Sequence, residues 1–391
     1  MLIISQLRTG RKHTMELDLT KIRDEIDIVD KEIVEYFQKR MKLCEQVAQY
    51  KIENGKKVFD KEREEQKIEK VVSMAEGDFN RKSVGELFSQ IMSMSRKLQY
   101  QILTENGKGE KLALKKVDTL DMSDVKVVYQ GVPGAYSQQA MIKYFGKDVE
   151  NFNVKTFRDA FEAVKDGRAD YAVLPIENST AGIVEDVNDL LYEYDNYIVA
   201  ETDVLVRHAL IGTQDATIED IKTVYSHPQG LMQCEEYLDE HEEWQRIAKE
   251  NTAGSARKVM KDNDKSHAAI ASVIAAEIYG LKVLEDNINH NDKNTTRFII
   301  LGNKRVFKAD ASKVLITFEV SHESGSLYHL LSHFIFNGVN MCMIQSRPIR
   351  EKNWEYRFFV EVEGNLSDEG MQNALNGIRH EASSFKVIGS Y

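Results

Sequence analysis

Residues 18–55 read DLTKIRDEIDIVDKEIVEYFQKRMKLCEQVAQYKIENG. Apolar residues recur here at alternating steps of three and four, which predicts one long amphipathic helix from Asp18 to about Glu53. Asp18 suits the N-cap, and Asn54-Gly55 marks the end of the helix. At about 1.5 Å per residue the helix would be roughly 50 Å long, so it needs a helical partner in a hairpin or a dimer. The apolar residues are Ile22, Ile26, Val29, Ile33, Tyr36, Leu43 and Val47.

Two cationic residues lie on this apolar stripe. Arg40 continues the series toward the interior, and Lys51 follows about 20° around the helix and roughly 16 Å along it. A buried cation without a partner costs several kcal/mol, so an anion is expected between the two side chains. That anion is either a small bound molecule or a carboxylate of the chain itself, with Asp60, Glu62 and Glu64 as the nearest choices. A third interpretation is that the long side chains extend to solvent.

Two further helices are predicted at about 61–76 and 83–102. Asp60, Arg63 and Glu64 open the first of them, and Ser95 and Gln99 share one face of the second. Eight residues of this region match, in order and spacing, the active-site residues of the all-helical chorismate mutase family, which residues 15–105 resemble. The eight are Arg23, Arg40, Lys51, Asp60, Arg63, Glu64, Ser95 and Gln99.

This resemblance implies a pericyclic rearrangement of chorismate to prephenate, which needs neither a nucleophile nor a proton transfer. The enzyme must hold a dianion in a compact conformer and stabilise charge on the breaking ether oxygen. By resemblance, Arg40 would bind a carboxylate with help from Ser95. Lys51 and Gln99 would be the catalytic residues at the ether oxygen.

The other charged residues of the set are expected at the ring hydroxyl and in a second chain. By resemblance, Glu64 and Asp60 would contact the ring hydroxyl of the substrate. Arg23 would bind the other carboxylate, but it lies about 100° from Arg40 around the helix and cannot easily serve the same pocket. In the family, intertwined dimers place this arginine in the partner's site, and the same arrangement is expected here.

Between residues 125 and 302, short β-rich runs alternate with helices, which indicates an α/β fold. Four segments have the form of a strand, a small polar turn and a helix, and helix N-termini suit carboxylates. One such turn is usually only a capping motif, but four together suggest a cleft for a small anion, as in two-lobed binding proteins. No GxGxxG dinucleotide fingerprint is present. The segments are 131–137, 177–182, 226–230 and 251–254.

The strings in these turns are similar to those of the prephenate dehydratase family over about 125–303. That family has two α/β lobes, like periplasmic binding proteins, with the site between them. The strings are Gly134-Ala135-Tyr136-Ser137, Leu174-Pro175-Ile176-Glu177-Asn178-Ser179, Ser226-His227-Pro228-Gln229 and Thr296-Arg297-Phe298.

The resemblance implies that prephenate loses its ring hydroxyl and a carboxylate together, driven by aromatisation. Thr296 is the expected catalytic residue, as a hydrogen-bond donor to the leaving oxygen, because a threonine has no useful acidity near pH 7. Arg297 has a structural alternative, and the turn context of His227 favours a structural role over acid catalysis. The expected substrate-binding residues are Tyr136, Ser137, Glu177, Asn178, Ser179, Gln229 and Arg297.

From residue 312 onward the predicted order is strand, helix, strand, strand, helix, strand, which is a ferredoxin-like βαββαβ unit. Gly325-Ser326-Leu327 and Gln345-Ser346-Arg347-Pro348 make it similar to the ACT family, whose domains in such enzymes bind phenylalanine at a dimer interface. Ser326 replaces the usual alanine and Gln345 the usual glutamate. Losing that glutamate removes a partner for the effector's ammonium or for Arg347. The expected effector-binding residues are Gly325, Leu327, Asn340, Ser346 and Arg347.

The composition limits location and partners. The 391 residues carry a formal net charge of −11, which argues against nucleic-acid or anionic-membrane binding. Cys44, Cys234 and Cys342 are too far apart for a zinc or disulfide framework, so the cytoplasm is the expected location. No apolar run is long enough for a signal peptide or a membrane span. Neither reaction needs a metal, nucleotide or redox cofactor, and no motif for one is present.

Together the resemblances imply a bifunctional enzyme of phenylalanine biosynthesis that converts chorismate to prephenate and prephenate to phenylpyruvate. The expected layout is a basic leader (1–14), an all-α mutase domain (15–105), a linker (106–123), a dehydratase domain (124–303) and an ACT domain (311–391). A dimer or tetramer is expected. The alternatives are a regulatory binding protein without catalysis, or a chain in which one of the two sites is active.

Overall fold

The computed structural model describes residues 18–109, 113–349 and 352–391. The chain separates into two compact units, Met1–Gly109 and Glu110–Tyr391, and each is described by itself. The predicted leader, 1–14, lies outside the described residues. Within the described part, no helix combines the length and the apolar character that a membrane span requires.

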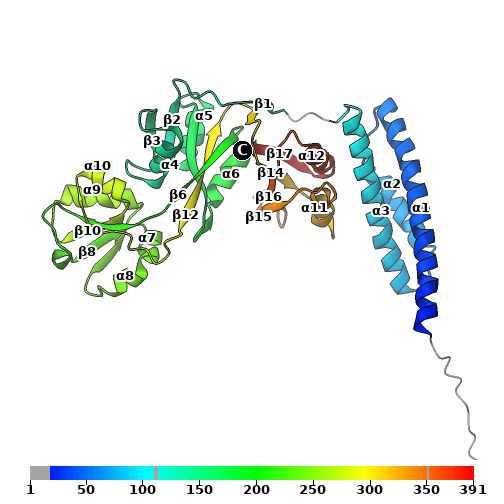
Figure 1. Cartoon of the computed structure of the whole chain (residues 1–391), viewed down its shortest axis with the longest axis horizontal. Helices are drawn as coiled ribbons and strands as arrows, with labels where there is room; N and C mark the ends of the chain where they lie inside the picture. The colour runs from blue at the N-terminus through cyan, green and yellow to red at the C-terminus, as the bar shows by residue number, and fades with distance from the viewer. Residues whose placement is uncertain (1–17, 110–112, 350–351) are drawn as a thin grey trace, which may run out of the picture. The chain divides into compact units, whose positions relative to one another are not determined.

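The first unit consists of three helices, as predicted (Figure 1). The long helix α1 begins after Asp18, whose carboxylate accepts hydrogen bonds from the backbone N–H groups of Thr20 and Lys21. It ends at Gly55, whose φ of 61° is in the left-handed region that glycine adopts without strain. The prediction of one continuous helix with these two ends is confirmed. The helices are α1 (Leu19–Asn54), α2 (Lys61–Val72) and α3 (Asp78–Glu105).

The boundary between α2 and α3 was predicted wrongly. The second helix ends at Val72 rather than 76, and the third begins at Asp78 rather than 83. Gly77, with φ of 78°, turns the chain into α3, and Asp78 places a carboxylate in its first turn, where the helix dipole favours it. Residues 78–82 read DFNRK and carry no apolar period, so the pattern did not reveal that they are helical.

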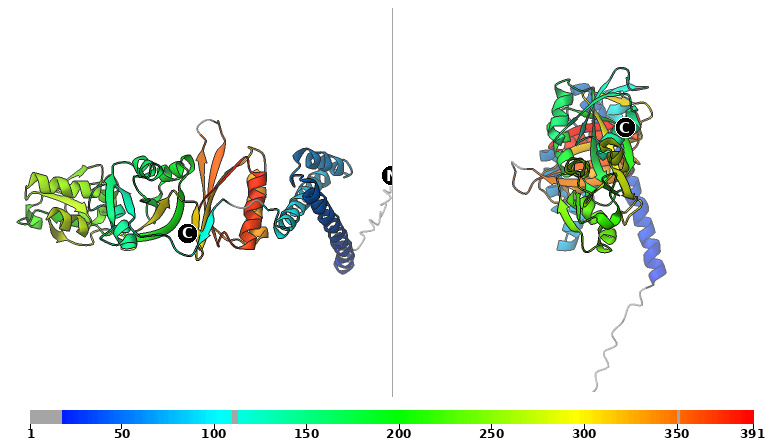
Figure 2. Two further views of the ribbon diagram at one scale, coloured as in Figure 1. Left: turned by 90° about the horizontal axis from the view of Figure 1, so that it is seen from above. Right: turned by 90° about the vertical axis from the view of Figure 1, so that its left-hand side faces the viewer.

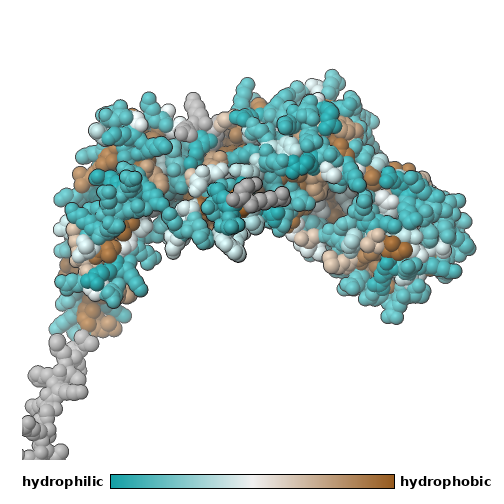
Figure 3. All heavy atoms as spheres, turned by 180° about the vertical axis from the view of Figure 1, so that it is seen from behind, coloured by the Kyte–Doolittle hydropathy of each residue, from teal (hydrophilic) through white to brown (hydrophobic). Residues whose placement is uncertain are grey.

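The apolar stripe of α1 is largely uncovered within one chain. Ala48 is the one fully buried residue among those described in this helix. Ile26 and Ile33 are 52% and 58% exposed, and Leu43 is 54% exposed. Figure 3 shows apolar residues on the surface of the helical unit. Large exposed apolar patches are typical of interaction surfaces.

The second unit begins in a segment that was predicted as a linker. Strand β1 (Lys115–Val117) pairs in parallel with β13 (Val306–Lys308), so residues 106–123 are not simply a linker. Leu114 and Leu120 pack against apolar clusters of this unit. The polar composition of the segment concealed these two anchoring residues.

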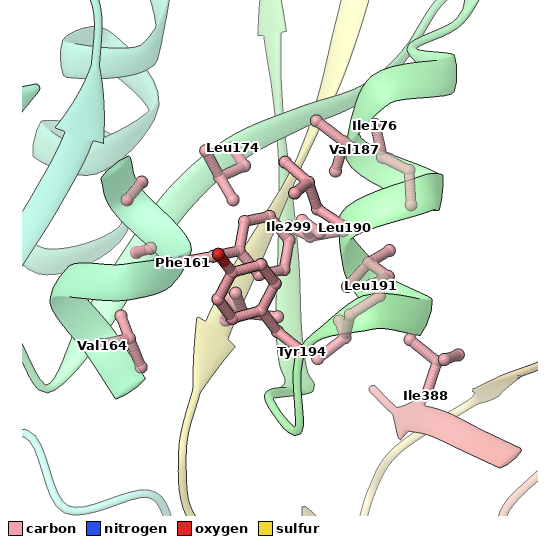
Figure 4. Packing of buried hydrophobic residues seen from close by; sticks show 14 of the residues in the cluster. Phe161, Val164, Leu174, Ile176, Val187, Leu190, Leu191, Tyr194, Ile299 and Ile388 are labelled. Carbon is pink, nitrogen blue, oxygen red and sulfur yellow. The ribbon is translucent and has the colours of Figure 1, made fainter. Parts of the chain in front are cut away.

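The first α/β lobe contains five main strands in the order β3-β2-β4-β12-β6. Helices α5 and α6 bury a cluster against this sheet that includes Phe161, Leu191 and Ile299 (Figure 4). The strands are β2 (Lys126–Gln130), β3 (Glu150–Val154), β4 (Tyr171–Asn178), β6 (Tyr197–Leu205) and β12 (Thr295–Gly302), with β5 (Gly182–Ile183) beside β4. The helices are α4 (Tyr136–Phe145), α5 (Phe157–Lys165) and α6 (Glu185–Glu193).

The second lobe is a five-stranded sheet in the order β11-β7-β10-β8-β9. The chain enters it after β6 and returns before β12, so the two lobes share two connections and the predicted two-lobed α/β layout is observed. Its strands are β7 (Ala209–Gly212), β8 (Thr223–Ser226), β9 (Gln245–Ala248), β10 (His267–Ala271) and β11 (Lys282–Glu285). Its helices are η1 (Ile218–Asp220), α7 (Pro228–Gln233), α8 (Glu235–Asp239), α9 (Thr252–Asp262) and α10 (Val273–Tyr279).

The C-terminal part has the predicted ferredoxin-like topology, with strands in the order β15-β16-β14-β17. Helices α11 and α12 lie side by side next to this sheet (Figures 1 and 2). The elements are β14 (Lys313–Glu319), α11 (Ser326–Phe336), β15 (Met341–Pro348), β16 (Tyr356–Glu363), α12 (Glu369–Glu381) and β17 (Ser384–Ser390).

This sheet continues directly into the sheet of the first lobe. Strand β17 pairs in parallel with β6 through Gly389 and Ile198. A Cβ atom at Gly389 would lie 2.3 Å from the carbonyl oxygen of Ile198, so only glycine allows this approach. Ile388 joins the apolar cluster under α6 (Figure 4). The C-terminal βαββαβ part is therefore packed against the lobe that carries β12.

Candidate active sites

Arg40 and Ser95 meet at the interface between α1 and α3. The Arg40 Nη1 atom donates to Ser95 Oγ and lies 3.5 Å from the carbonyl oxygen of Ile91. Ser95 is buried, and its Oγ donates to Ile91 O at 2.7 Å. Two predicted residues that are 55 positions apart in sequence are thus in direct contact.

Lys51 lies near the end of α1 and points toward the start of α2. Its Nζ donates to the carbonyl oxygen of Val58 at 2.6 Å, so the acceptor is a backbone group rather than a carboxylate. Burial lowers the pKa of Lys51 below its ordinary value, although Asp60 and Glu64 oppose this shift by favouring the charged form. The lysine is therefore a partly desolvated cation with two carboxylates near it.

Gln99 lies one turn after Ser95 and is 5% exposed. Its Nε2 donates to the carbonyl oxygen of Ser95 at 3.0 Å. Its Oε1 is buried, and no partner for it occurs among the described residues. A buried polar atom without a hydrogen bond costs about 1–3 kcal/mol, which is typical of a group that a ligand contacts.

The remaining mutase residues lie on α2 and far along α1. Asp60 caps α2 by accepting from the backbone N–H of Arg63 at 3.2 Å, and both side chains are exposed. Glu64 forms an ion pair with Arg96, a residue that the pattern did not single out. Arg23 is exposed, and it lies 17 residues, or about 25 Å, before Arg40 on the same helix. One chain does not bring Arg23 to the others.

The dehydratase residues meet where β4 ends and β12 begins. Thr296 pairs with Asn178 in the antiparallel register of these strands. The Asn178 Nδ2 donates to Thr296 Oγ1 at 2.9 Å and to Asn294 Oδ1 at 2.8 Å. The Asn178 Oδ1 accepts from the backbone N–H groups of Thr180 and Ala181. Since its hydroxyl oxygen already accepts from Asn178, Thr296 can donate its own proton to another group.

Ser179 takes part in the hydrogen bonding between β4 and β12. Its backbone N–H donates to Thr295 O at 2.8 Å, and its Oγ accepts from Thr295 N at 2.9 Å. Ser137 is buried in the first turn of α4. Gln229 lies in the first turn of α7, where its backbone N–H donates to His227 Nδ1 at 3.2 Å. Burial lowers the pKa of His227, so the ring acts as a neutral cap of α7.

Tyr136 and Arg297 are occupied by contacts within the chain. The Tyr136 hydroxyl donates to Arg207 O at 2.6 Å and lies 3.1 Å from His208 Nδ1. Arg297 forms ion pairs with Glu177 at 3.0 Å, with Glu201 at 3.2 Å and with Glu361 of β16 at 2.7 Å. Glu177 and Arg297 therefore bind each other, and Arg297 also joins β12 to β16.

Sequence reasoning missed His208, which is 2% exposed and lies between Tyr136 and Gln233 Oε1. Burial lowers its pKa, so it is a neutral hydrogen-bonding residue at the crossing into the second lobe. It also missed Glu361, because a partner on a strand far along the chain leaves no local pattern. In the described residues, no group of three or more His, Cys, Asp or Glu could hold a metal ion.

The predicted effector residues are divided between two places. Gly325 lies at the start of α11 with φ of 82°, and Leu327 follows it. Arg347 of β15 instead forms an ion pair with Asp189 of α6 at 2.8 Å and another with Glu185. Gln345 Oε1 accepts from Asn188 Nδ2 of α6 at 2.6 Å. The β15 motif thus contacts the helix that follows the Asn178 turn.

Asn340 and Ser346 are the other two predicted effector residues. Asn340 lies just before β15, where its carbonyl oxygen accepts from Glu363 N at 2.9 Å. Ser346 pairs with Phe358 in the β15–β16 register. Both residues take part in the pairing of β15 with β16.

A cavity of about 980 Å³ lies between helices α5 and α6 and the C-terminal βαββαβ part, away from Thr296. Arg158, Arg357 and Lys386 line it, and none of the predicted substrate residues does. Arg158 is paired with Glu193, and Lys386 donates to the carbonyl oxygens of Leu191, Tyr192 and Tyr194. Its cations are already bound within the chain, and the hydrogen-bonded cluster at Asn178 and Thr296 is the better candidate for chemistry.

The three-helix unit with its partly buried cations and the two-lobed α/β unit define a multifunctional enzyme for small carboxylate substrates. The family model for "Chorismate mutase type II" matches residues 22–100, and that for "Prephenate dehydratase" matches residues 127–306. The chain is 33% identical over 377 residues to the bifunctional chorismate mutase/prephenate dehydratase of Buchnera aphidicola subsp. Acyrthosiphon pisum, covering 94% of this chain and 95% of the relative. The chain belongs to the bifunctional chorismate mutase/prephenate dehydratase family.

Other relatives agree with this assignment. The Escherichia coli K12 protein of the same name is 28% identical over 97% of each chain. A prephenate dehydratase from Arthrobacter aurescens, solved in complex with L-Phe, matches with a TM-score of 0.64 and 29% identity over 68% of this chain and 89% of its own. A protein described as a quorum-quenching acylase, GqqA, matches with a TM-score of 0.63 and 31% identity over 68% of this chain and 97% of its own.

The predicted activities are confirmed. The chain is an enzyme of phenylalanine biosynthesis with a chorismate mutase and a prephenate dehydratase domain. The family models and the relatives favour the enzyme over the alternative of a regulatory binding protein that has lost catalysis.

Proposed function

We propose that Arg40 and Ser95 bind a carboxylate of chorismate, while Lys51 and Gln99 stabilise charge on its ether oxygen. The direct contact between Arg40 and Ser95 carries this proposal, because it brings two of the assigned residues into one pocket. Lys51 is partly desolvated, which lowers its pKa, and in its charged form it acts strongly on a nearby oxygen. Glu64, with Asp60 and Arg63 beside it, would contact the ring hydroxyl.

The mutase site is shared between two chains in this proposal. The uncovered stripe of α1 provides the surface for a partner helix, and Arg23 at the far end of α1 enters the partner's pocket. The test is subunit exchange between Arg23→Ala and Lys51→Ala variants, each inactive as a mutase by itself. Mixed dimers hold one intact site, so random exchange should restore about one quarter of wild-type activity. No restored activity after verified exchange would exclude the shared site.

In the dehydratase site, Thr296 donates a hydrogen bond to the leaving hydroxyl of prephenate. Asn178 supports this role, because it donates to the threonine oxygen and directs the threonine proton away from itself. Ser137, Ser179 and Gln229 line the turns at which the carboxylates would bind, with helix N-termini adding N–H donors. Tyr136, Glu177 and Arg297 hold these turns and strands in place through the contacts described above.

We further propose that residues 311–391 form an ACT domain that senses phenylalanine through Gly325, Leu327, Asn340, Ser346 and Arg347. Two observations support it, the ferredoxin-like strand order and the L-Phe complex of the Arthrobacter relative. Because Arg347 and Gln345 contact α6, an effector that rearranges β15 would move the helix next to Asn178. Titrating both activities with phenylalanine tests this. Unchanged rates at saturating phenylalanine would exclude regulation through this domain.

We propose domain bounds of 15–105, 124–303 and 311–391 for these three functions. Cys44, Cys234 and Cys342 are free, which supports a reducing compartment such as the cytoplasm. Ultraviolet assays of chorismate loss and phenylpyruvate formation test both activities in one preparation.

A further inference from the structure

A buried arginine outside the eight assigned mutase residues binds one of them. Arg96 of α3 is 6% exposed, and its Nη1 forms an ion pair with Glu64 Oε2 of α2. The guanidinium also lies 4.9 Å from the centre of the Phe59 ring. Taking a guanidinium out of water is costly, so a buried arginine indicates a specific use for its charge.

The position of Arg96 connects it to the pocket. It follows Ser95 directly and is therefore rotated by about 100° around α3, toward α2 instead of α1. Glu64 in turn acts on the charge of Lys51. A continuous set of charged groups thus runs from α1 through α2 to α3.

We propose that Arg96 is a positioning residue of the mutase reaction, which holds Glu64 in one orientation so that its carboxylate accepts the ring hydroxyl of the substrate. This inference rests on the proposed function, because Glu64 is given its role there. The ion pair uses Oε2 of Glu64 and leaves Oε1 able to accept a further hydrogen bond.

The chemistry of arginine fits this task. A free glutamate side chain samples several rotamers, and ordering it when the substrate binds lowers the rate. A guanidinium is planar and always charged, so it fixes a carboxylate in direction as well as in place. The ring of Phe59 restricts the guanidinium on its other side. The carboxylate is then oriented before the substrate arrives.

The test compares Arg96→Met and Arg96→Lys in the full chain, with Arg81→Met as control. Arg81 lies on the same helix but is 53% exposed and pairs with Asp78. Arg96→Met should lower mutase kcat/KM by about 10- to 100-fold, mainly through kcat, and Arg96→Lys should recover part of it. Arg81→Met should leave it unchanged. Dehydratase activity on prephenate reports that the rest of the chain is intact.

A double-mutant cycle separates positioning from a structural role. If Arg96 acts through Glu64, Arg96→Met should change kcat/KM less than about twofold in a Glu64→Gln background. It should also have little effect on the slower reaction of a chorismate analogue without the ring hydroxyl. An equal loss in both backgrounds, or an equal loss with the analogue, would overturn the proposal.

The Arg40→Ala variant separates an error in the proposed pocket from an error in the role of Arg96. If Arg40→Ala retains mutase activity, the proposed pocket itself is wrong. If Arg40→Ala abolishes the activity while Arg96→Met keeps kcat/KM within about twofold of wild type, only the role of Arg96 is wrong.

Discussion

The helical unit and the Asn178–Thr296 cluster show two different ways to build a site for a carboxylate substrate. In the helical unit the assigned residues are long charged side chains on an apolar stripe, and most of that stripe is exposed in one chain. At the cluster they are short polar groups on two paired strands, and Thr296 is 9% exposed. In our proposal a second chain covers the first site, whereas the residues of the second are placed by the ladder between β4 and β12.

The difference fits the chemistry that we propose for each site. A pericyclic rearrangement needs a compact dianion, which a few strong cations can select. Departure of a hydroxyl needs a hydrogen bond at one defined oxygen, and a strand with fixed register places a threonine accurately. Charge therefore dominates the first site, and geometry dominates the second.

The largest effect is expected from Arg40→Ala. This change removes a charge-assisted bond to a substrate carboxylate and leaves Ser95 without its guanidinium partner. Mutase kcat/KM should fall by about 10³-fold, while dehydratase activity on prephenate stays at the wild-type level. Steady-state assays with chorismate and with prephenate on the same preparation check both parts. A parallel fall in both activities would show that the two units are not independent.

Thr296→Val should have the next largest effect, on the other reaction. Valine keeps the shape of threonine but cannot donate to the leaving oxygen, and it also leaves Asn178 Nδ2 without one acceptor. Dehydratase kcat should fall by about 10²- to 10³-fold. Thr296→Ser is the matched control, because it keeps the hydroxyl and should retain most of the activity. If serine and valine are equally damaging, the hydroxyl is not the reacting group.

The sequence predicted the helix α1 better than the elements around it. The period of α1, its cap at Asp18 and its stop at Gly55 are local signals, and the structure has all three. Arg96 escaped notice because a charged residue that faces α2 breaks no apolar pattern. The start of α3 was missed because its first turns are polar.

Around the second site, local strings located Asn178 and Thr296 but not what holds them. Arg297 binds Glu361, which lies 64 residues later on β16, and no local pattern relates the two. The strand β1 was hidden for the same reason, since its partner β13 is far along the chain. Contacts between distant segments depend on tertiary packing, which a single sequence does not display.

The ion pairs around Arg297 lead to a third prediction, which concerns stability. Glu361 is 3% exposed and accepts two hydrogen bonds from Arg297 Nη1 and one from the Tyr391 hydroxyl. Glu361→Gln removes its charge and leaves a buried guanidinium underneutralised, so the larger unit should lose about 3 kcal/mol of unfolding free energy. Urea denaturation of the full chain measures this, with the transition of the helical unit as an internal reference. A loss below about 0.5 kcal/mol would mean that Glu177 and Glu201 neutralise Arg297 sufficiently by themselves.

A fourth prediction concerns pH and the mutase alone. Burial lowers the pKa of Lys51, so this lysine loses its proton at a lower pH than an exposed lysine does. Mutase activity should therefore decline on the alkaline side before pH reaches about 10.4, the ordinary lysine value. Lys51→Arg should move that decline upward, because arginine stays protonated. A decline that is identical in both proteins would assign it to another group.

The smallest effect is expected from His227→Asn, and it tests whether the second site uses geometry rather than a titrating acid. Burial lowers the pKa of His227, so at pH 7 the ring is neutral and accepts from Gln229 N as a helix cap. Asparagine can accept the same bond, since it is a good N-cap residue. The dehydratase rate between about pH 7 and 8 should keep the wild-type profile, because a group that is already neutral in this window has no proton to exchange. If the profile instead loses a limb, His227 is a catalytic acid, and the second site depends on charge as the first one does.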